Sequence, residues 1–310
     1  DILCLKMAAH TEAKRIAYFT MDPKNPLVLQ HIQAGGLAVV LEEGIRGHMI
    51  TFYDEGLHLP MLWTHLIPAT MEGRAMHNVQ NAMAAALMAY AMDIKVDNIR
   101  QGLRTFDTSF FQVPGRMNVF DEHPFKVILD YGHNPAAIQA MVNFVGRMDV
   151  EGRRICVVSA PGDRRDEDIL EIAGKVAAGN FEKIIVRRDD NPRGRDEREV
   201  PLLIQRGLLD GGVPEENIQL CIEEEAAVAQ ALEMAHRGDL VLIFGDAITR
   251  CWKQIINHKS VRDDAAHEIS EIDPEGFTDL GPPPGISAEE FETLVIDERG
   301  ARLAAEEESD

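Results

Sequence analysis

The sequence contains little cysteine and no long apolar run, and both absences narrow the class of protein to which it can belong. Its four cysteines (Cys4, Cys156, Cys221 and Cys251) form no Cys-x-x-Cys pair and have no histidine at metal-ligand spacing, which argues against a zinc site or a disulfide framework. No stretch of about 18 apolar residues occurs, so we expect no membrane span. The first residues also lack a basic segment followed by an apolar one, as a signal peptide would have. We therefore expect a cytoplasmic protein with reduced thiols.

Basic residues are scarce relative to acidic ones. The 31 Lys and Arg against 52 Asp and Glu give a formal net charge of −21. Residues 260–310 carry −13 of this charge, and the other 259 residues carry only −8. Because no basic stripe is available to neutralise phosphates, we expect no nucleic-acid partner.

The first region, residues 1–117, reads as mixed α and β structure. Short runs typical of strands cover 15–20, 36–41 and 47–53. Two helices are predicted after them, an alanine-rich one over 77–92 and a shorter one over 96–103. So much alanine allows close approach to neighbouring elements, which is typical of a buried packing helix.

The second region, residues 118–259, alternates between apolar β-type runs and helical stretches. The runs cover 126–130, 154–159, 183–187, 218–221 and 240–244, and the helical stretches cover 135–147, 166–178, 197–209 and 223–236. Alternation at this spacing predicts a parallel sheet with helices on both faces, and continuous apolar runs are typical of strands buried on both sides. We predict a doubly wound, Rossmann-like α/β domain.

The third region, residues 260–310, has few large apolar residues and a high negative charge. Such a segment cannot bury enough surface to offset its chain entropy, so we predict a disordered acidic tail. One short helix is expected locally, over 288–295. The chain also begins with Asp rather than Met, which suggests a fragment or a processed chain.

Polar residues follow four of the predicted strands in the second region, over 130–135, 159–165, 188–195 and 245–250. In a doubly wound sheet, ligands bind beyond the carboxyl ends of the strands. Each cluster alone is more often a helix cap or a solvated turn than a site. Because four of them fall on the same edge, we interpret this edge as a candidate binding site.

The residue types at this edge suit a nucleotide and a charged small molecule. Asp130 can accept hydrogen bonds from ribose hydroxyls, and Arg116 can contact phosphate or stack on a base. Asn81 can bind the amino group and a ring nitrogen of adenine. His133 is as well explained by a phosphate contact as by a structural turn. Arg193 and Arg195 offer guanidinium forks for a carboxylate.

Three motifs in this order resemble the Mur ligase and folylpolyglutamate synthase superfamily: His77-Asn78-Val-Gln-Asn81-Ala, Val113-Pro-Gly-Arg116 and Asp130-Tyr-Gly-His-Asn-Pro135. Two further runs, Gly162-Asp-Arg-Arg-Asp-Glu-Asp168 and Asp190-Asn-Pro-Arg-Gly-Arg195, are most similar to the Mur-like portion of the cyanophycin synthetase branch. The similarity covers about residues 1–258. It implies a truncated central ATP-binding domain over 1–117 and the C-terminal Mur ligase domain over 118–259.

The resemblance implies roles for individual residues. Those expected to hold ATP are Asn78, Asn81, Arg116, Asp130, His133 and Asn134, and His133 is also the candidate catalytic residue. Those expected to hold the incoming amino acid are Asp163, Arg164, Asp190, Asn191, Arg193, Asp246 and Arg250. Asp246 is expected to recognise a guanidinium, although it could equally cap the helix that begins near Ala247.

The activity that the resemblance implies is ATP-dependent formation of an amide through an acyl phosphate. In the cyanophycin branch, arginine is joined to the aspartate side chains of a polyaspartate backbone, and we expect a homo-oligomer. The alternatives are a peptidoglycan- or folate-type ligase of the same superfamily, or a non-catalytic paralogue that acts as a binding or assembly module.

The sequence departs from this superfamily in one motif. Members carry a glycine-rich loop that ends in Gly-Lys-Thr or Gly-Lys-Ser and cradles the phosphates. Neither Gly35-Gly36 nor Gly44 is followed by such a lysine. We expect this loop and the Mg²⁺ ligands to belong to a region upstream of Asp1, so no metal ligand is predicted here and the chain alone is expected to be inactive.

Overall fold

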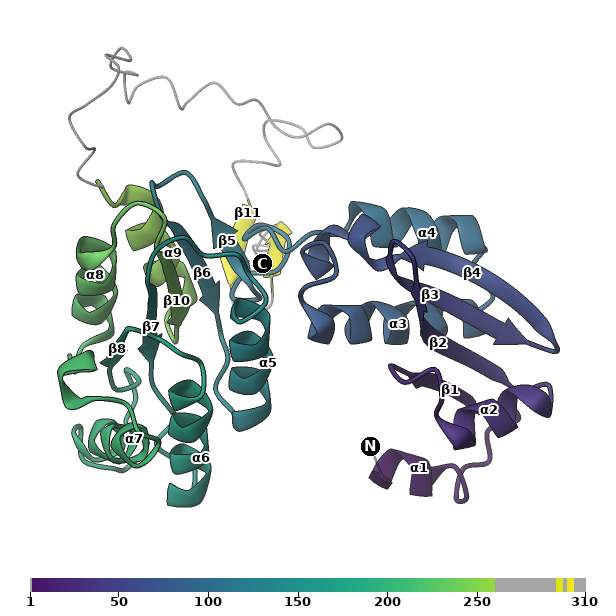
Figure 1. Ribbon diagram of the computed structural model, residues 1–310, viewed down its shortest axis with the longest axis horizontal. Helices are drawn as coiled ribbons and strands as arrows, with labels where there is room; N and C mark the ends of the chain where they lie inside the picture. Colours follow the sequence, from purple (N-terminus) through teal and green to yellow (C-terminus); the bar gives the residue numbers. More distant parts are fainter. Residues whose placement is uncertain (1, 260–293, 298–299, 304–310) are drawn as a thin grey trace, which may run out of the picture. The chain divides into compact units, whose positions relative to one another are not determined.

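The computed structural model describes residues 2–259, 294–297 and 300–303, which contain two larger sheets and one hairpin (Figure 1). The chain begins with helix α1 (Ile2–Met7). The first sheet has four strands in the order β1-β2-β3-β4, with bounds Ala17–Thr20, Leu37–Gly44, Gly47–Asp54 and Leu57–Trp63. β1 and β2 are parallel and are joined by α2 (Pro26–Gln33), whereas β2, β3 and β4 are antiparallel.

The first three strands confirm the sequence prediction, but β4 was missed. The run Leu57–Trp63 contains Pro60, and a proline inside an apolar run argues against a strand unless it lies at a sheet edge. β4 is the edge strand of this sheet, and the pairing shifts its register between Ile50 and Thr51, close to Pro60. The bulge accommodates the missing N–H.

Helices α3 (Met76–Ala91) and α4 (Val96–Thr105) pack against the first sheet. Ala82 and Ala86 of α3 are buried in the same core as Phe52 of β3, which confirms that the alanine-rich helix is a packing helix. Two short 3₁₀ turns, Thr64–Leu66 and Pro68–Thr70, connect β4 to α3.

The second sheet has six strands in the order β5-β6-β10-β7-β8-β9. Their bounds are Asn118–Phe120, Lys126–Asp130, Leu240–Phe244, Arg154–Val158, Lys183–Val186 and Ile218–Leu220. All neighbouring pairs are parallel except β5 and β6. Of the six strands in this sheet, β10 comes last in the sequence, yet it lies between β6 and β7. The three-residue β5 was not predicted.

Five helices cover the two faces of this sheet (Figure 1). They are α5 (Pro135–Val145), α6 (Asp166–Ala177), α7 (Glu199–Asp210), α8 (Glu224–Met234) and α9 (Ile248–Asn257), and a 3₁₀ turn, Glu215–Asn217, precedes β9. Ile128 of β6 packs with α5, α6 and α7, whereas its neighbours Val127 and Leu129 pack with α8 and α9. Successive side chains of one strand thus face opposite cores, which confirms the doubly wound α/β fold.

Most of the predicted acidic tail lies outside the described residues. Within it, β11 (Leu294–Asp297) and β12 (Gly300–Leu303) form an antiparallel hairpin. The short helix expected over 288–295 is therefore wrong for Leu294 and Val295, and its remainder lies outside the described residues. The predicted domain boundaries at 117 and 259 remain predictions.

In the described residues, none of the helices combines the length and the apolar character that crossing a membrane requires.

Candidate functional site

The four polar clusters predicted to share an edge do lie together. The strand order places the carboxyl ends of β6, β10, β7 and β8 side by side. The Gly245 amide donates to the Asp130 carbonyl at 2.9 Å, and the Asp190 amide donates to Asp246 Oδ2 at 3.2 Å. Across from them, Arg193 forms an ion pair with Asp163 at 2.8 Å. We call this edge, formed by residues 130–135, 159–165, 188–195 and 245–250, the rim.

Beneath the rim lies a buried ion pair, Arg187 and Glu224, that the sequence did not reveal. Arg250, a half-buried residue of the rim, contacts this pair, and we call Arg187, Glu224 and Arg250 the ionic hub. Arg187 and Glu224 are each 1% exposed, and a guanidinium nitrogen of Arg187 lies 2.9 Å from Glu224 Oε1. Arg250 donates to the other carboxylate oxygen and also to Asp190 Oδ1, at 2.9 Å. Burial alone would raise the pKa of Glu224, but Arg187, the amides of Asp246 and Ala247, and Arg250 together lower it below its usual value.

No signal in the sequence separated Glu224 from its neighbours. It stands in Glu223-Glu224-Glu225 at the start of α8, where acidic residues are expected because they suit a helix N-terminus. Its neighbours Glu223 and Glu225 are exposed, and only Glu224 turns into the protein. Arg187 ends the apolar run 183–187, so the sequence indicates only that it is the last residue of a strand.

The same carboxylate provides the cap of α9. The amides of Asp246 and Ala247 donate to Glu224 Oε1 and Oε2, at 2.6 and 3.1 Å. The N-cap residue is Ala247, and no side chain of the cap position itself makes a capping bond. The alternative interpretation of Asp246 as a helix cap is therefore wrong, because a residue from α8 performs that role.

The side chain of Asp246 therefore does not cap α9 and contacts the rim instead. It is half-buried and accepts one hydrogen bond, from the Asp190 amide. Within residues 2–259 no ion pair involves Asp246, whereas Asp163, Asp189 and Asp190 each face an arginine. Asp246 is thus a rim carboxylate without a cation, as expected of a group that binds a cationic ligand.

The loop after β8 is held in a tight conformation. Arg193 has φ +50°, a left-handed conformation that is costly for a residue with a side chain and is often found at binding sites. A side chain at Gly162 would lie 2.1 Å from the Pro192 carbonyl, so the two loops approach as closely as glycine allows. Asn191 accepts the Arg193 amide at 2.9 Å, which gives it a turn-forming contact.

The arginines of the rim differ in how strongly they are engaged. Arg195 donates to the carbonyls of Gly162 and Arg164 and to two carboxylates, Asp166 and Glu199, so it fastens the loops together rather than offering a free fork. The Arg193–Asp163 pair is partly exposed, and such pairs in water are weak enough for a ligand to replace. The exposed side chain of Arg164 lies at the same end of the sheet.

Four of the residues predicted to bind the nucleotide line one cavity of about 720 Å³, namely Asn78, Asn81, Arg116 and Asp130. Most of the remaining lining is apolar, from α3, α4 and α5, which suits a flat base. Asn81 is exposed and its amide nitrogen lies 3.2 Å from Asn78 Oδ1, while Asn78 donates to the Ala69 carbonyl at 2.7 Å. The donor and acceptor sets of these residues therefore fit a nucleoside.

Asp130 shows the electrostatic character of a binding carboxylate. It is 8% exposed and accepts the Met117 amide at 2.9 Å. Burial raises the pKa of Asp130, although the Met117 amide and Arg116 act in the opposite direction. The exposed guanidinium of Arg116 lies 5.7 Å from the centre of the Tyr131 ring, close enough for a cation–π contact.

The last two predicted nucleotide residues have structural contacts. Asn134 is the N-cap of α5, and its Oδ1 accepts the Ala137 amide at 2.9 Å. His133 Nδ1 lies 2.9 Å from the Tyr131 carbonyl and donates to it. Neither residue lines the cavity.

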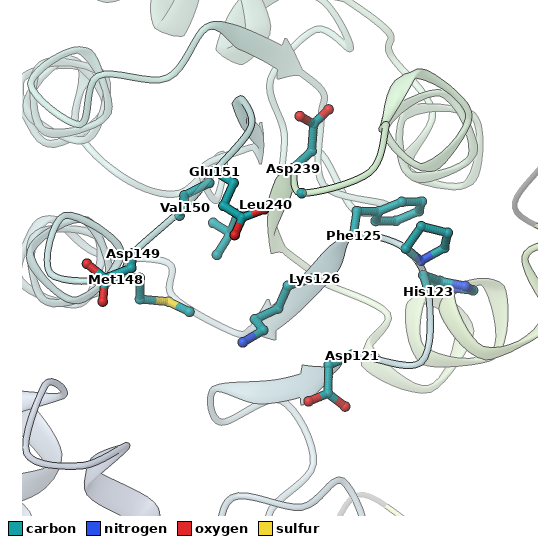
Figure 2. Close-up of a pocket in the computed structure, with 12 residues that line it drawn as sticks. Asp121, His123, Phe125, Lys126, Met148, Asp149, Val150, Glu151, Asp239 and Leu240 are labelled. Atoms are coloured by element: carbon teal, nitrogen blue, oxygen red, sulfur yellow. The ribbon is translucent and has the colours of Figure 1, made fainter. Parts of the chain in front are cut away.

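The described residues offer no group of three or more His, Cys, Asp or Glu side chains able to hold a metal ion. No step is assigned to a metal here. A smaller cavity of about 260 Å³ lies at the opposite edge of the second sheet, where β6 and β10 begin (Figure 2). Its most buried carboxylate, Asp239, is fully engaged by Arg153 and the His236 amide.

Most of the rim lies in a part of the chain that matches a known family of domains. Residues 115–247 match the Mur ligase, glutamate ligase domain. The chain is 42% identical over 255 residues to a cyanophycin synthetase from Trichormus variabilis, covering 80% of this chain and 27% of that protein. It is 38% identical over 261 residues to a cyanophycin synthetase from Synechocystis sp., covering 84% and 29%.

More distant similarities extend to other ligases. A UDP-N-acetylmuramoyl-L-alanyl-D-glutamate–2,6-diaminopimelate ligase from Aquifex aeolicus is 32% identical over 163 residues, which cover 52% of this chain and 31% of that protein. The solved structure of E. coli FolC in complex with DHPP and ADP is 20% identical, with a TM-score of 0.52 over 77% of this chain and 52% of that one. The latter similarity concerns the fold alone.

Residues 115–247 form a glutamate ligase domain of the Mur ligase type, and the expected resemblance of the chain to cyanophycin synthetase is confirmed. It spans less than a third of the length of the cyanophycin synthetases that it matches.

Proposed function

We propose that this chain is the C-terminal part of an ATP-dependent amide ligase that adds arginine to aspartate side-chain carboxylates, as the resemblance to the cyanophycin branch implies. ATP converts the acceptor carboxylate to an acyl phosphate, the amine of the amino acid attacks the acyl carbon, and phosphate leaves as the amide forms. The observation that carries the proposal is Asp246, a half-buried rim carboxylate without a cation partner among the described residues.

Two groups of this chain account for the two ends of arginine. Asp246 accepts the guanidinium in a charge-assisted pair, typically worth about 1.5–3 kcal/mol for a hydrogen bond to a charged group. Arg193 exchanges its exposed partner Asp163 for the α-carboxylate of the substrate. Arg164, Asp190, Asn191 and Arg250 complete the rim around them. His133, the candidate catalytic residue, lies at the end of β6 on the same edge.

The nucleotide is assigned to the cavity lined by Asn78, Asn81, Arg116 and Asp130. Asn81 is exposed on α3 and faces an apolar wall suited to adenine, and Asp130 supplies a buried acceptor for a ribose hydroxyl. Magnesium, the polyaspartate acceptor and a homo-oligomeric state are part of the same proposal.

The test is amino-acid-dependent ADP release by the full-length ligase that contains this chain, with a polyaspartate acceptor and a panel of amino acids. Arginine is expected to give the highest kcat/KM. Citrulline, which has the shape of arginine without its charge, is expected to be a poor substrate. Equal use of the two amino acids would contradict recognition of the guanidinium.

A peptidoglycan-type ligase is the second candidate function, because Asp190-Asn-Pro-Arg193 and the similarity to diaminopimelate ligases both allow it. Release of ADP with diaminopimelate and a muramyl peptide acceptor, but not with arginine, would select it.

A further inference from the structure

We infer that Glu224 is a positioning residue for the incoming amino acid, acting through Arg187, Arg250 and the first turn of α9 on the carboxylates of Asp246 and Asp190. The inference rests on the proposed function, and it assigns a role in specificity to a buried residue that does not itself reach the substrate.

The first argument is connectivity. Glu224 accepts three hydrogen bonds, from the Asp246 amide on Oε1 and from the Ala247 amide and Arg250 on Oε2, and its Oε1 also forms the ion pair with Arg187. The Asp246 amide belongs to the same residue as the rim carboxylate. A change at Glu224 therefore shifts the backbone that carries the Asp246 side chain.

The second argument is that Arg187 fixes the neighbouring strand ends to the same point. Its guanidinium donates to the Phe244 carbonyl at 2.7 Å and to the Arg188 carbonyl at 2.8 Å, and it lies 3.4 Å from Asp189 Oδ1. Ser159, at the end of β7, donates to the same Asp189 oxygen at 2.5 Å. The ends of β7, β8 and β10 are thereby tied to one carboxylate on α8.

The third argument concerns Asp190. Arg250 bridges Glu224 and Asp190, so the position of the Asp190 carboxylate depends on the hub. The Asp190 amide in turn donates to Asp246. Asp190 and Asp246, the two carboxylates proposed to face the cationic ligand, are therefore connected to each other directly and also through Arg250 and Glu224.

The fourth argument is charge. The connected groups are two guanidinium ions (Arg187 and Arg250) and four carboxyl groups (Asp189, Asp190, Glu224 and Asp246), a formal charge of −2 when all are ionised. An arrangement with an excess of negative charge attracts a cation and disfavours a neutral or anionic side chain. Arg187 and Arg250 neutralise part of the negative charge of these carboxylates, whereas Asp246 has no ion-pair partner in the described part of the chain and can bind the cationic ligand.

A positioning role and a purely structural role are separated by three variants of the full-length ligase. Glu224→Gln removes the nearer of the two counter-ions of buried Arg187 and leaves only Asp189, so it is expected to lower Tm by roughly 10 °C. The double variant Arg187→Met/Glu224→Gln removes both charges, retains one acceptor for the α9 amides, and is expected to recover most of that loss. Arg250→Met removes only the bridge to Asp190 and, being partly exposed, is expected to remain folded.

The decisive measurements are the KM values for arginine and ATP and the preference for arginine over citrulline. In the double variant and in Arg250→Met, the arginine KM is expected to rise about 10-fold, equivalent to about 1.4 kcal/mol, while the ATP KM stays unchanged. The preference for arginine over citrulline is expected to fall. The matched control is Glu225→Gln, which alters the exposed neighbour on α8 and is expected to change neither quantity.

The possible outcomes distinguish this inference from the proposed function. A wild-type arginine KM in folded Arg250→Met and in the double variant would overturn the positioning role and leave the proposed function intact. If the wild-type enzyme consumes a different amino acid, the arginine assignment fails, and the KM for that amino acid in the same variants then decides the role of Glu224. A wild-type enzyme that releases no ADP with any amino acid would overturn both.

Discussion

The carboxylate of Glu224 and the guanidinium of Arg187 form an ion pair at 2.9 Å in which neither side chain is more than 1% exposed. Two charges taken out of water are stable only when further hydrogen bonds satisfy them. Glu224 meets this condition because it also accepts two backbone amides, and Arg187 meets it in part, since it donates to two carbonyl oxygens while its buried Nε has no partner among the described residues. The pair lies directly beneath the candidate binding edge, and it makes several predictions about stability and specificity possible.

The first prediction is that Glu224→Gln lowers the free energy of unfolding of the chain by about 3–5 kcal/mol at pH 7, because it breaks a buried ion pair and leaves Arg187 with only the more distant Asp189. The folded-state pKa of Glu224 is lowered from the usual 4.5, so its contribution is fully present above that value and is lost as the pH falls through the folded pKa. Urea unfolding from pH 7 to acid should show wild type and variant converging below about pH 4.5. Glu225→Gln should stay within about 0.5 kcal/mol of wild type at every pH.

The second prediction is that Asp130→Asn stabilises the chain and weakens nucleotide binding. Burial raises the folded pKa of Asp130, so the ionised form is a cost at neutral pH that disappears as the pH falls toward the usual value of 3.8. Tm at pH 7 should rise by roughly 2–4 °C, the shift that about 1 kcal/mol produces in a domain of roughly 150–250 residues.

The gain in Tm for Asp130→Asn should shrink on acidification, and the affinity for ADP, measured by calorimetry, should fall about 10-fold because one charge-assisted hydrogen bond is lost. Asp121→Asn, at an exposed position on the opposite edge, is the control. A lower Tm at pH 7 for Asp130→Asn would show that the carboxylate stabilises the fold, contrary to this prediction.

The third prediction separates binding from capping at Asp246. Because Glu224 caps α9, Asp246→Asn should leave Tm unchanged, and the asparagine Oδ1 can still accept the Asp190 amide. In the full-length ligase the arginine KM should rise about 10-fold or more, consistent with loss of about 1.5–3 kcal/mol from a charged pair. The KM for ATP should not change. An arginine KM equal to that of wild type would remove Asp246 from the site.

The fourth prediction is that the 310-residue chain by itself neither hydrolyses ATP nor forms an amide. Phosphoryl transfer depends on positioned positive charge around the phosphates, and the sequence holds no Gly-Lys-Thr or Gly-Lys-Ser loop. The measurement is arginine-dependent ADP release at micromolar chain concentration. Release that scales with chain concentration and stops after proteolysis would refute the prediction.

Much of the second sheet could be predicted because its strands are apolar throughout. Runs such as Lys126–Asp130 and Leu240–Phe244 are buried on both faces, and that requirement is visible in the order of residues along the chain. The helices between them carry the 3.6-residue spacing of an apolar face. β4 was not predicted because Pro60 argues against a strand. A proline is tolerated there only because β4 lies at the edge of the sheet, which the sequence does not show.

The binding edge was predictable for a similar reason, since the polar clusters stand directly after those strands. Asp130, Asp190, Asp246 and Arg193 could be proposed because parallel strands place their carboxyl ends together whatever their order. The sequence could not show that Asn134 caps α5 or that Arg195 holds two loops, because asparagine and arginine serve such structural roles as readily as binding ones.

The local pattern of residues thus determined by itself the class of fold, the candidate binding edge and the resemblance to Mur ligases. Only the tertiary structure decided which charges meet. Glu224 meets Asp246 and Arg250 because β10 inserts between β6 and β7 and carries the start of α9 to α8. Strand order is set by the packing of the whole sheet, and periodicity along one segment holds no information about it. For that reason Asp246 emerged as a candidate from the sequence, whereas the carboxylate that caps its helix emerged only from the fold.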